Sequence, residues 1–186
     1  GVQALGNYAY VVTDNTAAEF QVIDMTTLTS PILLATADLP GSAAANELDL
    51  SGDKAYVITA NNATGSEFHV VDVADPGAPS VNGSVDLGNG GNAIEMNGTT
   101  AMIVTSTAAR TLQIVDASLP TAPILSDSLH LSDQAYNGLF FDGTRIYVAG
   151  SDSNMEFLVL QISATTGWEC LEKKADVNLT GSRTVQ

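Results

Sequence analysis

Short runs of apolar residues, separated by Gly, Asn, Asp, Ser and Thr, follow one another along the whole chain at a regular spacing. The centres of four matching runs are Tyr10, Tyr56, Met102 and Tyr147, which lie 46, 46 and 45 residues apart. A period in the forties that is made of strands is typical of the blades of a β-propeller. We therefore predict an all-β fold, a β-propeller of four-stranded antiparallel blades, with four blades in these residues.

Each repeat follows the same order of elements. Residues 51–72, SGDKAYVITANNATGSEFHVVD, contain a turn, a strand, a polar loop and a second strand that ends on an aspartate. The same order recurs where NYAYVV precedes FQVID, TTAMIV precedes LQIVD and TRIYVA precedes FLVLQ. Prolines at 31, 79 and 123 precede the outermost strands, because proline cannot donate to a sheet ladder. We expect blades at 1–45, 46–91, 92–136 and 137–182, and the start of a further inner strand at 183–186.

The positions of the repeated asparagines bear on how many blades the propeller has. Asn46, Asn92 and Asn137 share one repeat position, and the next equivalent falls near Ser182 or Arg183. Four blades and the start of a fifth fit either a piece of a larger propeller or a four-bladed ring with an overlapping closure. Open blade faces expose apolar surface and unpaired edges. We therefore expect a single propeller segment that is part of a larger propeller, from a mature chain or a fragment.

The repeat motifs also resemble a known family. AYVV, AYVI, AMIV and IYVA on the second strand, with FQVIDMTTLTSP, FHVVDVADPGAP and LQIVDASLPTAP after it, are similar to the LVIVD-repeat family of β-propellers. The fourth repeat departs from this pattern, because Gln161 replaces the aspartate and TTGWECLEKK replaces the proline turn. The resemblance implies a secreted or cell-surface protein. It implies no particular chemistry.

Two residue types recur once in each of three repeats, and both are expected to be structural. An aspartate at a strand end can accept hydrogen bonds from backbone N–H groups two or three residues on and so fix the following turn. An asparagine at the entry to the inner strand can bridge the backbones of neighbouring blades, or alternatively help to form a polar ring at the central channel. The aspartates are Asp24, Asp72 and Asp116, and the asparagines are Asn46, Asn92 and Asn137.

The charge balance narrows the choice of partner. With 21 acidic and 6 basic side chains the formal net charge is -15. This charge repels nucleic acid and anionic membrane surfaces, so neither is expected as a partner. No span of about 20 apolar residues occurs, and Cys170, the only cysteine, has no disulfide partner in this sequence. Four Asn-x-Ser/Thr sequons are candidate glycosylation sites: Asn62, Asn82, Asn97 and Asn178.

No motif for catalysis or cofactor binding is evident. His69 and His130 lie on strands of different blades, with no transition-metal spacing, and no Gly-x-Ser-x-Gly elbow or phosphate loop occurs. We predict no catalytic, cofactor or metal residue. Calcium stays open, because equivalent loops after the second strand carry oxygen donors, with solvated turns as the alternative. These loops contain Asp14-Asn15, Asn61-Asn62 and Asp152-Ser153-Asn154.

A group of aromatic residues near the divergent fourth repeat is open to two interpretations. It can form a binding patch, or it can belong to the core or to a seam with a neighbouring domain. The residues are Tyr136, Phe140, Phe141 and Trp168.

Three functional hypotheses follow. The first is a non-catalytic extracellular propeller that displays loops for binding or adhesion, or assembles into a surface structure or filament, with a protein or glycan partner or with itself. The second is a hydrolase or lyase at the propeller axis, with Glu47, Glu95 or Asp142 as acid and base. The third is a cytosolic scaffold that binds peptides on the top face of the propeller.

Overall fold

The computed structural model describes residues 1–63, 65–106, 111–131, 135–150, 157–163 and 167–172. These residues form four antiparallel sheets of four strands, each with its strands in chain order. This confirms the predicted all-β propeller architecture with four-stranded blades. The strands are β1 (Val2–Leu5), β2 (Tyr8–Val12), β3 (Phe20–Asp24), β4 (Ile32–Ala37), β5 (Ala45–Ser51), β6 (Lys54–Thr59), β7 (Phe68–Asp72), β8 (Ser80–Val85), β9 (Gly91–Asn97), β10 (Thr100–Thr105), β11 (Leu112–Asp116), β12 (Ile124–Leu129), β13 (Tyr136–Phe141), β14 (Arg145–Gly150), β15 (Phe157–Ser163) and β16 (Gly167–Glu172).

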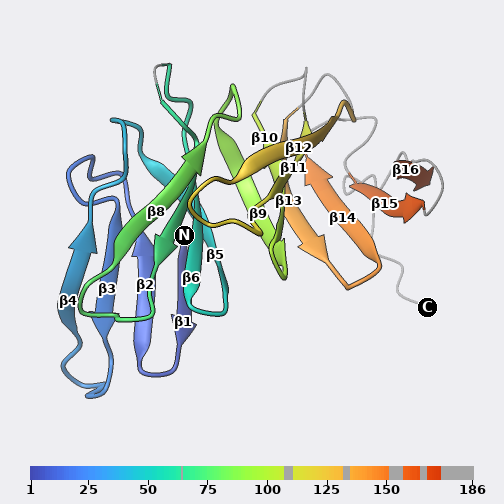
Figure 1. Cartoon of the computed structure of the whole chain (residues 1–186). Helices are drawn as coiled ribbons and strands as arrows, with labels where there is room; N and C mark the ends of the chain where they lie inside the picture. The colour runs from blue at the N-terminus through green and yellow to red at the C-terminus, as the bar shows by residue number, and fades with distance from the viewer. Residues whose placement is uncertain (64, 107–110, 132–134, 151–156, 164–166, 173–186) are drawn as a thin grey trace, which may run out of the picture.

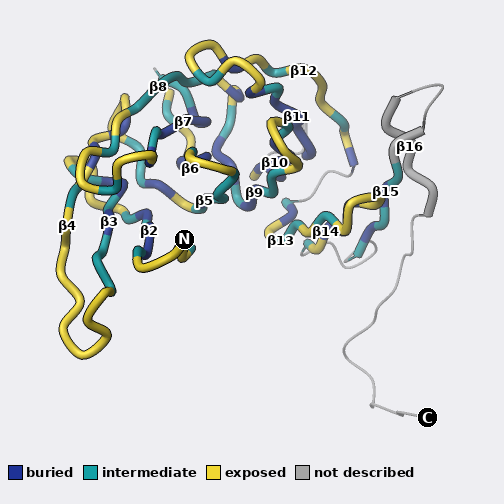
Figure 2. Tube along the Cα trace, turned by 60° about the horizontal axis from the view of Figure 1, so that its bottom comes forward, coloured by how far each residue is buried: buried dark blue, intermediate teal, exposed yellow. Residues whose placement is uncertain are grey.

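The sheets follow one another along an arc (Figures 1 and 2). In the view of Figure 2, β5, β9 and β13 lie on the inner side of the arc and β8 and β12 on the outer side. The main contacts between sheets join neighbours in the chain: β1 and β2 contact β5, β5 and β6 contact β9, and β9 and β10 contact β13. No helix long and apolar enough to cross a membrane occurs in the described part of the chain.

Local sequence explains the short connection inside each blade. Gly6, Gly52 and Gly98 follow the innermost strands of the first three sheets and have φ values of 62°, 64° and 62°. A positive φ at the first central residue of a two-residue turn matches the twist of a hairpin, and glycine adopts it without a steric penalty. The hairpins between first and second strands are thus specified by single glycines.

The core lies between sheets, because the middle strands are apolar on both faces. We call the face of a sheet that points to the next sheet in the chain its forward face, and the opposite face its rear face. Forward faces carry larger side chains and rear faces carry smaller ones in the first two interfaces. Tyr10, Phe20 and Val22 pack in one buried cluster with Ala55, Val57 and Val71 of the second sheet, and Tyr56, Phe68 and Val70 pack with Ala101, Ile103 and Val115 of the third.

The third interface uses the same repeat positions. Met102, Leu112 and Ile114 on the forward face of β9–β12 pack with Ile146, Val148 and Leu160 on the rear face of β13–β16. The backbone of β16 supplies the outer strand of the fourth sheet. The domain boundaries, including the inner strand expected at 183–186, stay predictions, since residues 173–186 lie outside the described ones.

Candidate functional site

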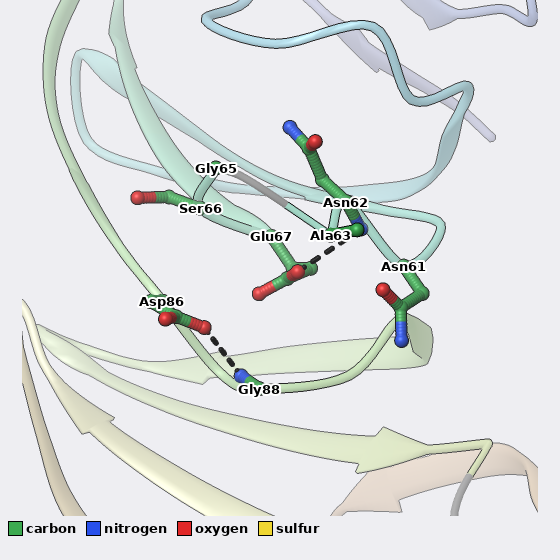
Figure 3. Close-up of a pocket in the computed structure, with 8 residues that line it drawn as sticks. All are labelled: Asn61, Asn62, Ala63, Gly65, Ser66, Glu67, Asp86 and Gly88. Atoms are coloured by element: carbon green, nitrogen blue, oxygen red, sulfur yellow. Dashed lines mark hydrogen bonds between the residues drawn. The ribbon is translucent and has the colours of Figure 1, made fainter.

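A polar pocket of about 520 Å³ lies at one end of the second sheet (Figure 3). It is formed by the connection between β6 and β7 and by the connection between β8 and β9. The pocket is lined by Asn61, Asn62, Ala63, Gly65, Ser66, Glu67, Asp86 and Gly88. Its size is within the range of small-molecule sites, but its lining is more polar than is usual for them.

Glu67 forms the floor of this pocket and precedes β7. Its side chain is only 1% exposed. Oε1 accepts a hydrogen bond from the Asn62 N–H at 3.0 Å, and Oε2 accepts one from the Leu87 N–H at 3.0 Å. Burial raises the pKa of the Glu67 carboxyl and the nearby Asp86 carboxyl adds to this, while the two N–H donors act in the opposite direction. Glu67 thus ties together the two connections that form the pocket.

The groups available to a partner lie around Glu67. Asp86 is exposed, and its Oδ1 accepts a hydrogen bond from the Gly88 N–H at 2.6 Å. Asn61 donates from Nδ2 to Asn89 Oδ1 at 3.3 Å. In Figure 3 the Asn62 side chain points away from Glu67, and its Nδ2 lies against Gly41 and Gly65. The pocket therefore offers carboxylate, amide and hydroxyl groups rather than an apolar surface.

Sequence reasoning missed the repeat position of Glu67. The equivalent residue is Glu19 in the first repeat and Thr111 in the third, and both are buried. Glu19 Oε2 accepts a hydrogen bond from the Leu39 N–H at 3.0 Å, and Thr111 Oγ1 accepts one from the Leu131 N–H. The available signal was an acceptor directly before an apolar strand in each repeat, namely Glu19-Phe20, Glu67-Phe68 and Thr111-Leu112. It was overlooked because these residues end polar loops.

The repeat aspartates all lie at the ends of third strands. Oδ1 of Asp24 accepts a hydrogen bond from the Thr26 N–H at 2.7 Å, Oδ1 of Asp72 from the Ala74 N–H at 3.0 Å, and Oδ1 of Asp116 from the Ser118 N–H at 2.8 Å. These N–H donors lower the pKa of all three carboxyls. Asp72 also pairs with a lysine, at 3.2 Å from Lys54 Nζ.

The repeat asparagines lie where the register of each inner strand shifts by one residue, at 46, 92 and 137. Asn46 Nδ2 donates to Gly91 O at 2.8 Å, and Asn92 Nδ2 donates to Tyr136 O at 2.9 Å. Asn92 Nδ2 also lies 3.1 Å from Asn137 Oδ1. At Asn46 and Asn92 the bulge turns the amide toward the next sheet.

The acidic residues considered for catalysis are not all at one place. Glu47 lies on β5 and Glu95 on β9, and the pKa of Glu95 is raised first by burial and then by Asp49 and Glu47. Asp49 accepts hydrogen bonds from Gln3 Nε2 at 2.8 Å and from the Met96 N–H at 2.7 Å. Asp142 lies beyond the end of β13, where Oδ1 accepts bonds from the Thr144 and Arg145 N–H groups at 2.8 Å.

The aromatic residues of the fourth repeat divide between two faces. Tyr136 is buried in the core of the third interface, and Phe141 packs against the same cluster. Phe140 points to the opposite face and is 57% exposed. The side chains of Trp168 and Cys170 lie outside the described ones, although both residues belong to β16. Tyr136, Phe140 and Phe141 therefore do not form one patch.

The two histidines have different environments. His69 is fully buried on β7, whereas His130 is exposed after β12. Burial lowers the pKa of His69 to about 4.

The sequons lie in three different surroundings. Asn62 packs against glycines as described above, Asn82 Nδ2 donates to Asp72 Oδ2 at 3.4 Å, and Asn97 is exposed at the end of β9. Asn178 lies outside the described residues. Their glycosylation stays a prediction.

The loops considered for calcium are described only in part. Asp14 is exposed, and Asn15 Oδ1 accepts a hydrogen bond from the Ala17 N–H at 3.3 Å. Residues 152–154 are outside the described part of the chain. Within that part, no group of three or more His, Cys, Asp or Glu side chains is placed to hold a metal ion.

Solved structures similar to this chain include a β-propeller domain. The computationally designed Ika4 protein aligns with a TM-score of 0.65 and 13% identity, over 87% of this chain and 89% of that one. The designed Ika8 protein has a TM-score of 0.61 and 12% identity over 89% of this chain and 46% of its own. The β-propeller domain of Myceliophteria thermophila Cps50 (Swd1) has a TM-score of 0.60 and 14% identity, over 87% of this chain and 50% of its own. At these identities the likeness shows the fold alone, and the chain spans about half the length of the last two structures.

Sequence comparison identifies the family. No curated protein matches the chain. The family model described as LVIVD repeat matches residues 1–38, 42–87 and 108–130, together more than half of the chain. These matches include the AYVV and AYVI strands. They also include FQVIDMTTLTSP, FHVVDVADPGAP and LQIVDASLPTAP, the three segments with an aspartate and a proline turn on which the resemblance rests. The chain therefore belongs to the LVIVD-repeat family of β-propeller proteins.

Proposed function

We propose that this propeller segment is a non-catalytic domain that works outside the cell and displays its loops to a protein or glycan partner. The observation that carries the proposal is the polar pocket at one end of the second sheet, in which Asp86 and Ser66 surround the buried Glu67. Carboxylates and amides that are already positioned by backbone hydrogen bonds bind donors without first having to be ordered. The family resemblance supports an extracellular location.

The charge of the chain favours one class of partner. A formal net charge of -15 raises the local concentration of basic groups and speeds their encounter with the protein. Within the pocket, Asp86 is the exposed carboxylate, because Glu67 is buried and bonded to two backbone N–H groups. A basic segment of a surface protein fits this arrangement better than a neutral glycan, since the lining has no aromatic side chain on which a sugar could stack.

Binding of the 186-residue chain to arrays of lysine-rich and arginine-rich peptides and of neutral glycans tests the proposal. Asp86→Asn is expected to weaken binding to basic peptides by about tenfold, as for the loss of one charged hydrogen bond. Asp38→Asn is the matched control, because Asp38 occupies the same repeat position in the first sheet and does not line the pocket. Equal binding by the two variants, or no binding to either array, would overturn the pocket as the binding site.

The extracellular location is tested separately, by fractionation of the source cells and by mapping glycans at Asn82 and Asn97. We expect the protein in the secreted or surface fraction. A protein found only in the cytosol and without glycans would contradict the extracellular role while leaving the pocket proposal to the binding experiment.

One observation favours the alternative of a hydrolase or lyase at the inner strands. The raised pKa of Glu95 beside Asp49 and Glu47 is the kind of pairing that acid and base catalysis uses. A screen of glycoside, ester and phosphoester substrates tests it, with Glu95→Gln as the inactive control. Turnover by the unchanged chain that the Glu95→Gln variant lacks would replace the non-catalytic proposal.

A further inference from the structure

A second pocket, of about 340 Å³, lies in the third interface, where β10 begins and β11 ends. Its lining combines apolar side chains with polar groups: Met102, Ile114 and Phe141 are apolar, and Thr100, Asp116 and Ser126 are polar. The apolar members on β10 and β11 are buried, whereas the polar members are exposed or half-buried. The pocket thus joins an apolar interior to a polar opening.

The third repeat has a small residue at a position where the first two repeats have a long one. Tyr8, Lys54 and Thr100 are each the cross-strand neighbour of the repeat aspartate of their sheet, and such neighbours project from the same face. Tyr8 packs against the buried cluster of the first interface. The side chain of Lys54 is only 14% exposed. Thr100 is too short to fill the equivalent space, which explains the pocket beside it.

The aspartate of the third sheet lacks the side-chain donors that its counterpart in the second sheet has. Oδ2 of Asp72 lies 3.2 Å from Lys54 Nζ and accepts a hydrogen bond from Asn82 Nδ2 at 3.4 Å. The third sheet has Ser126 at the position of Asn82, and its Oγ donates to a backbone carbonyl of β11 instead. Among the described residues the ion pairs involve Lys54, and none involves Asp116.

Asp116 is nevertheless ready to bind a cation. The Ser118 N–H donates to its Oδ1 at 2.8 Å and, with the Ser118 hydroxyl, lowers the pKa of the carboxyl, so the group is charged at neutral pH. The formal net charge of -15 also favours the approach of basic groups. A carboxylate beside an apolar pocket suits a cation that is carried on an apolar stem.

We propose that this pocket binds the side chain of a lysine from a partner polypeptide, with the ammonium at Asp116 and the alkyl stem on Met102, Ile114 and Phe141. The chain itself contains the pattern for this contact, because the mostly buried side chain of Lys54 places its Nζ at the equivalent aspartate of the second sheet. Lysine stems commonly cover apolar surface while the charged head stays near water.

A single contact of this kind is expected to be weak. Lys54 Nζ lies near two carboxylates, that of Asp53 at 2.7 Å and that of Asp72 at 3.2 Å. The third sheet has Thr99 at the position of Asp53, so the second of these carboxylates is missing beside Asp116. One lysine derivative is therefore expected to bind in the millimolar range, and a partner polypeptide to add contacts outside the pocket.

Titration of the 186-residue chain with Nα-acetyl-lysine amide, followed by NMR of the Met102 methyl group and the Ser118 N–H, tests the site. Nα-acetyl-norleucine amide is the matched neutral control, because it has the same four-carbon chain without the ammonium. We expect the lysine derivative to shift both signals and to bind about fivefold more tightly than the norleucine derivative. Equal binding of the two, or signals that neither of them shifts, would overturn the site.

Asparagine variants separate this pocket from the rest of the acidic surface. Asp116→Asn keeps an acceptor for the Ser118 N–H but removes the charge, and should weaken binding of the lysine derivative about fivefold. Asp24→Asn is the matched control, because Asp24 has the same repeat position beside Tyr8, and should leave binding unchanged. Asp86→Asn, in the pocket of the proposed function, should also leave it unchanged, so the two proposals succeed or fail separately. Equal weakening by all three variants would contradict the assignment to Asp116.

Thr100→Lys gives the third sheet the residue of the second, and its own side chain should fill the pocket and abolish binding of the lysine derivative. A folded Thr100→Lys variant that binds the derivative as the unchanged chain does would contradict the proposal. If the variant does not fold, the comparison of the lysine and norleucine derivatives on the unchanged chain decides.

The source of the ammonium is tested with 1,5-diaminopentane, which carries the same group on an unbranched chain but is not part of a polypeptide. A site for a partner's lysine should bind the lysine derivative at least as tightly as the diamine. Binding of the diamine without binding of the lysine derivative would mean that the pocket takes a free amine, and would overturn the polypeptide partner.

Discussion

Two interfaces between sheets carry polar side chains at the same repeat positions: the first lies between the first and second sheets, and the second lies between the second and third sheets. The two interfaces differ in how many of these polar groups have hydrogen-bond partners. In the second interface Glu67 binds a backbone N–H with each oxygen, and Gln113 Nε2 donates to Leu87 O at 2.9 Å. In the first interface Glu19 binds a backbone N–H only through Oε2, and His69 takes the position of Gln113.

The difference is visible in the buried atoms that have no hydrogen-bond partner among the described residues. The first interface has three such atoms, Glu19 Oε1 and both ring nitrogens of His69, and the second has one, Gln113 Oε1. An unsatisfied buried polar group costs about 1 to 3 kcal/mol. The repeat thus decides where polar groups are buried, while the residue at each position decides how well they are bonded.

The largest effect is expected at Glu67. Glu67→Ala leaves the N–H groups of Asn62 and Leu87 without their acceptor and should lower the free energy of unfolding by about 4 kcal/mol, at about 2 kcal/mol for each bond. Glu19→Ala removes one such bond and should cost about half as much. Urea denaturation of both variants measures the difference, and equal losses would mean that the two interfaces do not differ in this way.

The next effect depends on pH and belongs to His69. Its pKa is lowered from 6.5 to about 4 in the folded protein, so the unfolded chain takes up a proton more readily between these values. The stability that neutral His69 provides is complete above pH 6.5 and is lost as the pH falls toward 4, by about 3 kcal/mol in total.

His69→Gln, which introduces the residue found at position 113, should remove this loss. Urea denaturation at pH 7.5 and pH 4.5 compares the variant with the unchanged chain, and His130→Gln is the control because His130 is exposed. Glu67 and Glu95, whose pKa values are raised, act in the opposite direction in both proteins and cancel in the difference. An unchanged pH dependence in His69→Gln would contradict the assignment.

A smaller effect is expected at Gln113. Gln113→Leu leaves Leu87 O without its donor and should cost about 1.5 kcal/mol. Gln21→Leu changes the same repeat position on the rear face of the first sheet, where Nε2 reaches only Ala18 O at 3.4 Å, and should cost much less. Thermal unfolding of the two variants compares them. A loss at Gln21 as large as that at Gln113 would show that the bond to the neighbouring sheet is not what matters.

The smallest effect concerns the ion pair of Lys54 in the second sheet. Lys54 Nζ lies 2.7 Å from Asp53 and 3.2 Å from Asp72. Because both carboxylates are partly exposed to solvent, Lys54→Met should cost less than about 1 kcal/mol, and the cost should disappear in high salt. A larger loss that salt does not change would mean that packing of the lysine stem is its main contribution.

Much of the blade could be predicted from local sequence. The spacing of Tyr10, Tyr56 and Met102 placed the second strands, and the aspartates and prolines placed the turns, because strand alternation and turn chemistry act over a few residues. The burial of Glu19 and Glu67 was missed although an acceptor recurs before each apolar strand, since a carboxylate in a polar loop is ordinarily exposed. Only the packing of the next connection over the loop buries it.

The sequence by itself determined the period, the order of strands and the membership of the LVIVD-repeat family, because each depends on short-range patterns that recur in this chain. The tertiary structure alone decided which face meets which neighbour. Middle strands that are apolar on both sides carry no local sign of direction. Strand alternation alone makes Phe140 and Phe141 point to opposite faces, but only the packing of the sheets decides that Phe141 joins the core and Phe140 does not. The pockets around Glu67 and beside Thr100 depend on that long-range packing for the same reason.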